Sequence, residues 1–270
     1  MSIQTASQMQ AGSYRFRGSI SSANRLIETM GRLFFGLFPL FLLFLTLAFA
    51  QNSFAVDKLR VVTSEFPPYS YSAGGAAEGL AVDQVRLLLE DAGLDSRIEA
   101  YPWARAYEVA LREPNVLIFL IARTPEREAE FHWIGSLIDF DVKLFRLKDR
   151  DDIQLTDLRQ LADYKTGSLI RDVKGEFLHK QGVRTISYAT EESGVHMLKR
   201  GYIDLMPAEI NSFEYRVQRL GYSRDDFSVA WELEAISKPL YLALSKGSSP
   251  AVVEQVQRAF ARMQETSKQQ

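Results

Sequence analysis

The sequence contains no cysteine and only three histidines in 270 residues. The absence of cysteine excludes disulfides, thiolate metal sites, cysteine nucleophiles and attachment of lipid to a cysteine. The histidines, His132, His179 and His196, stand beside no serine–acid pattern and lack the spacing of metal ligands. A glycine-rich phosphate loop is also missing. These absences argue against hydrolase, zinc and nucleotide-binding chemistry, and no cofactor or metal is expected.

The charge balance is nearly even, with a formal net charge of −2 and no long basic run after the N-terminal region. A chain without a basic patch has little attraction for a phosphate backbone, so nucleic acid is not expected as a partner. The chain is long enough for one two-lobed domain or two small ones with a sizeable core. Small neutral or zwitterionic molecules therefore remain candidate ligands.

The N-terminal region, residues 1–50, is predicted to be a signal peptide. A basic residue precedes a nearly continuous apolar run over 33–49, which ends in the small-x-small pattern Ala48-Phe49-Ala50. The run is short for a membrane-spanning helix and contains Pro39, so cleavage is favoured over a transmembrane anchor. Cleavage would leave a mature chain that begins at Gln51.

Two details bear on the limits of this region. Ser53-Phe54-Ala55 offers a second cleavage site, which would give Val56 as the first residue. Residues before Met30 show no periodicity, and a start at Met30 would give a leader of ordinary size, which suggests Met30 as the true start. Because no cysteine lies near the cut, the mature protein is expected to be soluble in the periplasm, without a lipid anchor.

From Lys58 onward, short apolar runs alternate with amphipathic segments, which is typical of strands and helices in α/β layers. A first group of elements is expected to end at 147, and a charged stretch, 148–152, separates it from a second group. The expected strands are 59–62, 97–101, 116–121, 142–147, 164–169, 184–188, 202–206 and 240–245. The expected helices are 81–92, 103–112, 155–162, 173–180, 190–200, 209–220 and an amphipathic helix at the C-terminus.

A family resemblance rests on four segments: Glu65–Tyr71, Glu78–Asp83, Arg123–Arg127 and Gly201–Glu209. In order and spacing, the chain resembles the periplasmic solute-binding proteins of polar amino-acid ABC transporters, the bacterial extracellular family 3. The resemblance implies a type II periplasmic-binding-protein fold, in which two α/β lobes, each a mixed sheet flanked by helices, close on a ligand. It also implies a monomer that delivers an amino acid or similar small carboxylate to an inner-membrane ABC permease.

The same resemblance implies where the lobes begin and end. Lobe one would comprise 56–147 and 236–270, and lobe two would comprise 148–235. Two crossings, near 146–152 and 232–239, would join them, and the last strand and helix would return to lobe one. Binding would be coupled to closure, because only a ligand that contacts both lobes shifts the equilibrium toward the closed state.

The strongest candidate for a ligand contact is Arg127. Thr124 and Pro125 are typical of a helix N-cap and a first helical position, which places Arg127 in the first turn of a short helix. Free backbone amides and a guanidinium suit a carboxylate, because the helix dipole favours an anion and arginine can bind both oxygens. The alternative is a surface ion pair with a nearby glutamate. By the resemblance, Arg127 binds the ligand's α-carboxylate.

A second candidate is Glu209, which follows an expected strand and begins an expected helix. Open α/β sheets place their ligand crevices at such strand ends. The resemblance implies that Glu209 accepts the ligand's ammonium, at a position where the family usually carries aspartate. The alternative is a glutamate placed at a helix start because the helix dipole favours a negative charge there.

Three aromatic residues, Phe66, Tyr69 and Trp103, match positions where the family places aromatic walls around the ligand side chain. Aromatic faces would hold an apolar, planar or cationic group. The alternative is that they belong to the hydrophobic core, and Tyr69 is the weakest of the three candidates.

Several positions depart from the family pattern. Phe119, Leu120 and Ala122 stand where small hydroxyl residues are common, and Arg171-Asp172-Val173 replaces a glycine followed by serine or threonine. Asp172 is therefore a further candidate ligand contact, and ordinary amino-acid specificity is in question. Arg123 and Arg105 add positive charge near the expected cleft, and this charge would suit a second acidic group on the ligand. The alternative is that both lie at solvated ends of helices and strands, which is preferred for Arg105. Arg123 and Thr124 are kept as candidate ligand contacts.

Two other functions fit the same scaffold. One is an extracytoplasmic enzyme resembling cyclohexadienyl dehydratase, in which a cleft carboxylate with a raised pKa acts as general acid or base, and Glu209 is the candidate. The other is a receptor that presents its ligand to a membrane sensor instead of a permease. A non-enzymatic binding protein is the favoured interpretation.

Overall fold

The computed structural model describes residues 58–268, within a compact unit that spans Asp57–Gln270. The signal peptide expected over 1–50, the start at Met30 and the mature ends at Gln51 and Val56 lie outside the described residues. Between residues 58 and 268, no helix combines the length and apolarity that a membrane span requires.

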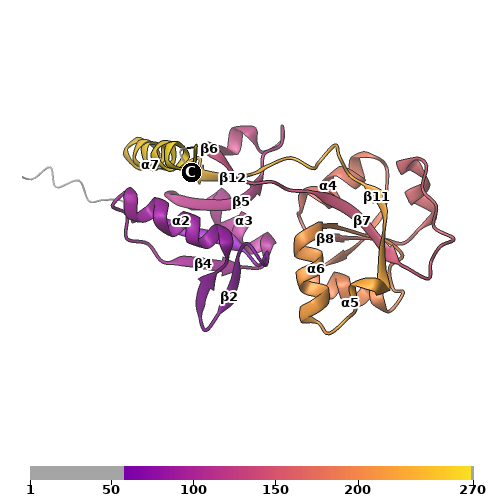
Figure 1. The fold of residues 1–270 in the computed structure, drawn as a ribbon. Helices are drawn as coiled ribbons and strands as arrows, with labels where there is room; N and C mark the ends of the chain where they lie inside the picture. The colour runs from indigo at the N-terminus through magenta and orange to yellow at the C-terminus, as the bar shows by residue number, and fades with distance from the viewer. Residues whose placement is uncertain (1–57, 269–270) are drawn as a thin grey trace, which may run out of the picture. The chain divides into compact units, whose positions relative to one another are not determined.

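One half of the unit is built on a five-stranded sheet of order β4-β1-β5-β12-β6 (Figure 1). Strand β1 pairs in parallel with β4 and β5, while β12 pairs antiparallel with β5 and β6. The strands are β1 (Arg60–Ser64), β4 (Ile98–Tyr101), β5 (Val116–Ala122), β6 (Phe131–Ile138) and β12 (Leu240–Ser245). We call this half the first lobe.

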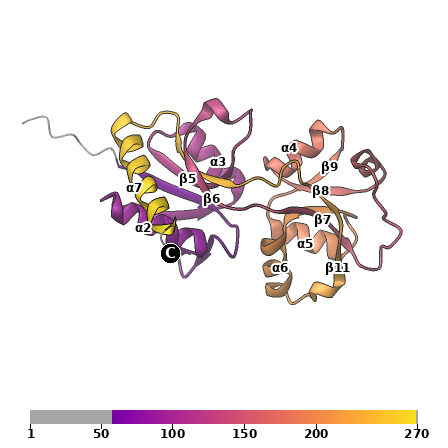
Figure 2. The same ribbon diagram turned by 45° about the horizontal axis from the view of Figure 1, so that its top comes forward.

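Three helices pack around the sheet of the first lobe. Helix α3 (Trp103–Arg112) lies against β1 and β5, while α2 (Leu80–Asp91) and α7 (Pro250–Lys268) lie side by side (Figure 2). In α2, Val82, Val85 and Leu89 are buried, and this helical spacing of apolar residues forms the face that meets the core. A hairpin of β2 (Tyr71–Ala73) and β3 (Ala76–Glu78) precedes α2.

The second lobe contains two small sheets. An antiparallel sheet has the order β10-β7-β11, and a parallel pair joins β8 to β9; a bridge between Thr166 and Leu205 connects the two. The strands are β7 (Val142–Leu147), β8 (Thr166–Leu169), β9 (Thr185–Tyr188), β10 (Met206–Glu209) and β11 (Phe227–Glu232). The helices are α4 (Val173–Lys180), α5 (Glu191–Lys199) and α6 (Ile210–Arg219), with short 3-10 helices η2 (Leu158–Asp163) and η3 (Arg224–Asp226).

The alternation of strands and helices is confirmed, but one strand is assigned differently. The sequence places 142–147 with the first lobe, whereas β7 pairs with β10 and β11 of the second. On this pairing, the chain crosses between the lobes at 139–141 and again at 233–239. The apolar pattern of 142–147 indicates a buried strand but carries no information about its pairing partners.

Other differences are local. The sequence did not predict β6 or β11, and the helix expected over 155–162 is the 3-10 helix η2. The strand expected over 202–206 is shifted to β10, Met206–Glu209. Polar residues interrupt the apolar pattern of β6, and its side chains are mostly half-buried, so a strict alternation is absent.

Candidate functional site

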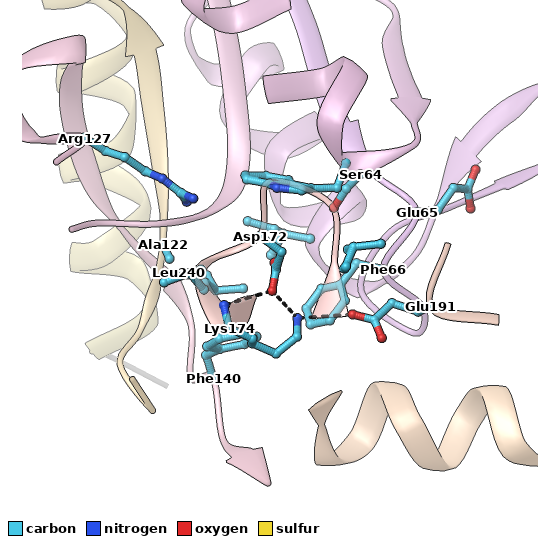
Figure 3. Close-up of a pocket in the computed structure, with 14 residues that line it drawn as sticks. Ser64, Glu65, Phe66, Ala122, Arg127, Phe140, Asp172, Lys174, Glu191 and Leu240 are labelled. Carbon is cyan, nitrogen blue, oxygen red and sulfur yellow. Dashed lines mark hydrogen bonds and ion pairs between the residues drawn. The ribbon is translucent and has the colours of Figure 1, made fainter. Parts of the chain in front are cut away.

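A small cavity of about 40 Å³ lies between the two lobes (Figure 3). Phe66, Trp103 and Leu120 of the first lobe give it an apolar wall. Charged side chains converge on the same space, which is typical of a ligand site, because charges seldom occupy a buried cavity without a function. The charged residues that line it are Glu65, Arg127, Asp172, Lys174 and Glu191.

The end of β5 sets the position of Arg127. Strand β5 is apolar and buried, as expected for the centre of a sheet covered on both faces. Leu120 has a φ of 62°, a left-handed conformation unusual for leucine, and the pairing with β12 skips this residue. Beyond the strand, Arg127 N donates to Thr124 O at 3.0 Å and closes a turn. This turn brings Arg127 to the cavity.

The helix expected to begin at Pro125 does not form. One turn of 3-10 helix, η1 (Glu128–Glu130), follows Arg127, and β6 begins immediately afterwards at Phe131. The few residues between β5 and β6 leave room for little more than one turn. Thr124 therefore caps no helix, and its Oγ1 is buried without a hydrogen-bond partner in the described part of the chain.

Arg127 is a buried cation, with only 2% of its surface exposed. Its Nη2 donates to both carboxylate oxygens of Glu176 at 2.9 Å, and its guanidinium carbon lies 4.8 Å from the ring centre of Tyr107. Its Nε and Nη1 have no hydrogen-bond partner among residues 58–268. Buried donors without partners are costly, so the guanidinium is only partly satisfied by the protein.

The surface ion pairs offered as the alternative for Arg127 form elsewhere. Glu126 pairs with Lys180, and Glu128 pairs with Arg123. Arg127 instead pairs with Glu176 of α4, which belongs to the second lobe.

A buried ammonium dominates the second-lobe side of the cavity. Lys174 Nζ lies 2.7 Å from Asp172 Oδ1 and 3.1 Å from Glu191 Oε1, and only 3% of its side chain is exposed (Figure 3). Burial lowers the pKa of Lys174, but the two carboxylates outweigh burial and hold its pKa above the ordinary value. Lys174 is therefore a buried cation on the second-lobe side of the cavity.

The residues around Lys174 come from two helix N-termini. Asp172 is the N-cap of α4, where its Oδ1 also accepts the backbone N–H of Lys174 at 3.0 Å. Glu191 is the first residue of α5, and its Oε2 is buried without a hydrogen-bond partner in the described residues. Arg171, with a φ of 58°, turns the chain toward the first lobe, where its carbonyl accepts Trp103 Nε1 at 2.7 Å.

Glu209 does not line the cavity. Its carboxylate accepts the backbone N–H groups of Asn211 at 3.2 Å and Ser212 at 2.7 Å, so it caps α6. Tyr69 lies on the same carboxylate, with its hydroxyl 3.4 Å from Glu209 Oε1. Burial raises the pKa of Glu209 and, together with the Glu209 charge, raises that of Tyr69. The helix-start alternative is the one that the geometry supports.

Two further candidates lie outside the cavity. Arg123 pairs with Glu128 and lies near the rings of Trp133 and Tyr241, and Thr124 lines the same neighbouring hollow as Arg123. Of the predicted site residues, the structure brings together Phe66, Trp103, Arg127 and Asp172 in the cavity, and it places Tyr69, Arg123, Thr124 and Glu209 elsewhere. Arg105 covers the ring of Tyr101 at 4.3 Å, which fits the solvated-end alternative.

Sequence reasoning missed Lys174 and Glu191. A lysine in the first turn of a helix is opposed by the helix dipole, and an aspartate two residues earlier signals a local ion pair that compensates for it. That signal was available for Lys174. Glutamate at a helix start is ordinary, so the sequence offers no comparable signal for Glu191.

The model of the bacterial extracellular solute-binding proteins, family 3, matches residues 59–270. The chain belongs to this family. No curated protein matches the chain by sequence.

Solved structures share the fold of this solute-binding protein. A histidine kinase sensor domain with similarity to periplasmic binding proteins is 14% identical, with a TM-score of 0.69, and the match covers 78% of this chain and 92% of that one. The arginine-, lysine-, histidine-binding protein ArtJ from Geobacillus stearothermophilus is 16% identical, with a TM-score of 0.67 and coverage of 78% and 91%. AbpA from Streptococcus pneumoniae, solved with L-arginine, is 17% identical, with a TM-score of 0.65 and coverage of 79% and 91%. The chain therefore has the two-lobed, type II periplasmic-binding-protein fold.

Proposed function

We propose that this solute-binding protein captures a small carboxylate in the cavity, closes its two lobes around it and delivers it to an ABC transporter from the periplasm. The observation that supports this most is Arg127, a buried guanidinium in the cavity wall whose Nε and Nη1 have no partner in the described residues. A ligand carboxylate would supply charge-assisted acceptors for these donors.

Glu176 would compete with a ligand carboxylate for Arg127. Its two oxygens accept hydrogen bonds from Arg127 Nη2, so a carboxylate of the protein already binds one nitrogen of the guanidinium. The Glu176 side chain is 37% exposed. It can turn toward water when a ligand carboxylate arrives, because its own charge would then be solvated.

The composition of the cavity supports a coupling of binding to closure. Arg127 and Trp103 belong to the first lobe, and Lys174 and Glu191 belong to the second. A ligand that contacts both sets of residues interacts with them together only when the lobes are closed. Such a ligand stabilises the closed state by its difference in affinity for the two states.

Delivery to a permease is supported by the family and by the structural neighbour AbpA, an amino acid ABC transporter substrate-binding protein. The sensor-domain neighbour makes presentation to a membrane sensor the second candidate. Uptake of labelled ligand by cells that lack the chain separates the two: uptake falls if the partner is a permease and is unchanged if it is a sensor. The dehydratase-like alternative receives no support from Glu209, which lies outside the cavity and caps α6.

The binding role is tested by a thermal-shift screen of amino acids, hydroxy acids, dicarboxylates and small peptides. A ligand that binds only the native state at about 100 times its Kd stabilises the protein by roughly 2.7 kcal/mol. For a domain of this size, that corresponds to a rise in Tm of about 5–10 °C. We expect at least one small carboxylate to give such a rise, and the absence of any rise across the acids would contradict the proposal.

A further inference from the structure

The second-lobe side of the cavity is already neutralised by the protein itself. The Lys174 ammonium lies between the carboxylates of Asp172 and Glu191, at 2.7 and 3.1 Å. Both carboxylates also stand at helix N-termini, Asp172 at α4 and Glu191 at α5. Each N-terminus contributes roughly half a positive charge, so one ammonium and two helix ends offset two carboxylates. No net negative charge remains there to attract a ligand cation.

Among the residues that line the cavity, two have polar atoms without partners in the described part of the chain, and these atoms define what a ligand must offer. On one side, Arg127 Nε and Nη1 are donors without acceptors among residues 58–268. On the other, Glu191 Oε2 is a buried acceptor without a donor among the same residues. Figure 3 shows Arg127, Lys174 and Glu191 around one space. A complementary ligand therefore carries an anionic acceptor for Arg127 and a hydrogen-bond donor for Glu191.

We propose that this donor is uncharged, so that the site selects a small hydroxy acid over the corresponding amino acid, because Lys174 already supplies the ammonium that an amino acid would bring. This inference rests on the proposed binding function and specifies its ligand class. A hydroxyl satisfies Glu191 Oε2 without adding charge. A ligand ammonium at that oxygen would place a second cation beside Lys174 in a buried site, where like charges repel strongly.

The volume of the cavity favours a small ligand. Its volume of about 40 Å³ corresponds to roughly three or four water-sized groups. Trp103, Phe66 and Leu120 close its first-lobe side. A hydroxy acid with a short carbon chain is closer to this volume than arginine is, and a longer ligand would extend into a hollow of about 380 Å³ that shares Glu65, Trp103 and Glu191 with the cavity.

The test uses pairs of ligands that differ only in a hydroxyl or an ammonium group. L-Lactate is compared with L-alanine, glycerate with L-serine, and L-malate with L-aspartate, by calorimetry on the whole mature protein. We expect the hydroxy member to bind at least about tenfold more tightly in every pair that binds.

Two lysine variants test the cause of the preference. Lys174→Met removes the internal ammonium, so the preference for the hydroxy member should narrow at least about tenfold or reverse. Lys199→Met is the matched control, because Lys199 also pairs with a carboxylate, Asp226, but lies outside the cavity lining. If Lys174→Met does not fold, as judged by circular dichroism, the double variant Lys174→Met/Asp172→Asn replaces it, because it neutralises the other carboxylate partner, keeps an N-cap for α4 and leaves Glu191 as the acceptor.

The outcomes separate this inference from the proposed function. Tighter binding of the amino members to the unmodified protein would overturn the inference and leave the binding function standing. A preference unchanged by loss of Lys174 would also overturn it, because another group would then set the selectivity. Absence of binding by every member of both series would overturn the inference and, with a blank carboxylate screen, the binding function as well.

Discussion

The two buried cations of the cavity differ in how fully the surrounding residues satisfy their hydrogen bonds. Lys174 has two carboxylate partners, whereas Arg127 leaves Nε and Nη1 unpartnered in the described part of the chain. Each unpartnered buried donor costs about 1–3 kcal/mol of stability. Such a cost is typical of a functional position, where a group is held ready for a ligand. The free protein would therefore tolerate the loss of Arg127 better than the loss of Lys174.

Glu209 gives a pH-dependent prediction. Burial raises its pKa above 4.5, so the folded state holds a proton more tightly than the unfolded state does. Its contribution to stability is present below about pH 4.5 and is lost as the pH rises through its folded pKa. Glu209→Gln keeps an acceptor for the α6 cap and removes this titration. We expect the Tm of the variant minus the Tm of the unmodified protein to increase as the pH rises from 4 to 7.

The control for this prediction is Glu214→Gln on the same helix. Glu214 pairs with Arg224 at the surface, where its side chain is 45% exposed. Its Tm difference from the unmodified protein should not show the same trend. A Tm difference for Glu209→Gln that stays constant with pH, or that shrinks as the pH rises, would refute the assignment of a raised pKa to Glu209.

At the scale of residues, the sequence predicted only part of the site. Arg127 and Phe66 could be found because they lie within segments that carry the family resemblance, whereas Trp103 lies outside those segments and was matched to a family position. Glu209 could not be placed, because a glutamate at a helix start can either cap its own helix or face a ligand. The short distances to the Asn211 and Ser212 amides decide this, and they depend on the backbone.

Among the elements, helix α4 and the loop before it make most of the ionic contact between the lobes. Arg171 pairs with Glu108, Glu176 with Arg127, and Lys180 with Glu126. These pairs alternate in sign along the segment, so they fix how it lies against the first lobe. Because each pair joins the second lobe to the first, the pairs favour the arrangement in which the lobes lie together.

The double variant Glu108→Gln/Glu126→Gln tests this contribution. It removes the outer two pairs and leaves Arg127 and Glu176 in place. We expect the ligand-free variant to show a larger radius of gyration by small-angle X-ray scattering, since more molecules would be open. The increase should be partial, because exposed ion pairs are individually weak.

Acid should also increase the radius of gyration of the ligand-free protein, as the double variant does. Lys180 lowers the pKa of Glu126 to about 2, and Arg171 lowers that of Glu108. These pairs are intact above about pH 4.5 and are lost as the pH falls through the folded pKa values.

The matched control for Glu108→Gln/Glu126→Gln is Glu214→Gln/Glu254→Gln, which removes pairs within single lobes. An equal radius in both double variants would show that the pairs do not hold the lobes together.

The elements themselves were largely predictable, but their pairing was not. The helical spacing of apolar residues located α2 and α3 almost to the residue. The strand β7 was expected at its observed position and yet belongs to the other lobe, since sheet pairing depends on residues distant in sequence such as β10 and β11. The left-handed conformation of Leu120, which helps to place Arg127, has no signal in the sequence.

In the whole molecule, the family membership and the two-lobed fold agree with a protein that works by closing on a ligand. The cavity draws its lining from both lobes, and its unpartnered groups belong to different lobes, Arg127 to the first and Glu191 to the second. Ligand binding should therefore shift the equilibrium between open and closed lobes toward the closed state.

The most direct test of this account is a calorimetric titration of the best small carboxylate into three proteins: the unmodified chain, Arg127→Met and Arg262→Gln. Arg262 pairs with Asp91 at the surface of the first lobe and serves as the matched arginine control. Arg127→Met leaves only the half-exposed Glu176 without its partner, so the variant should fold normally.

Loss of the charge-assisted contacts of Arg127 is worth roughly 1.5–3 kcal/mol, which corresponds to a weakening of about ten- to more than a hundredfold. We expect that loss for Arg127→Met and an unchanged Kd for Arg262→Gln. Equal affinity of Arg127→Met and the unmodified protein would contradict the central claim that Arg127 holds the ligand's carboxylate.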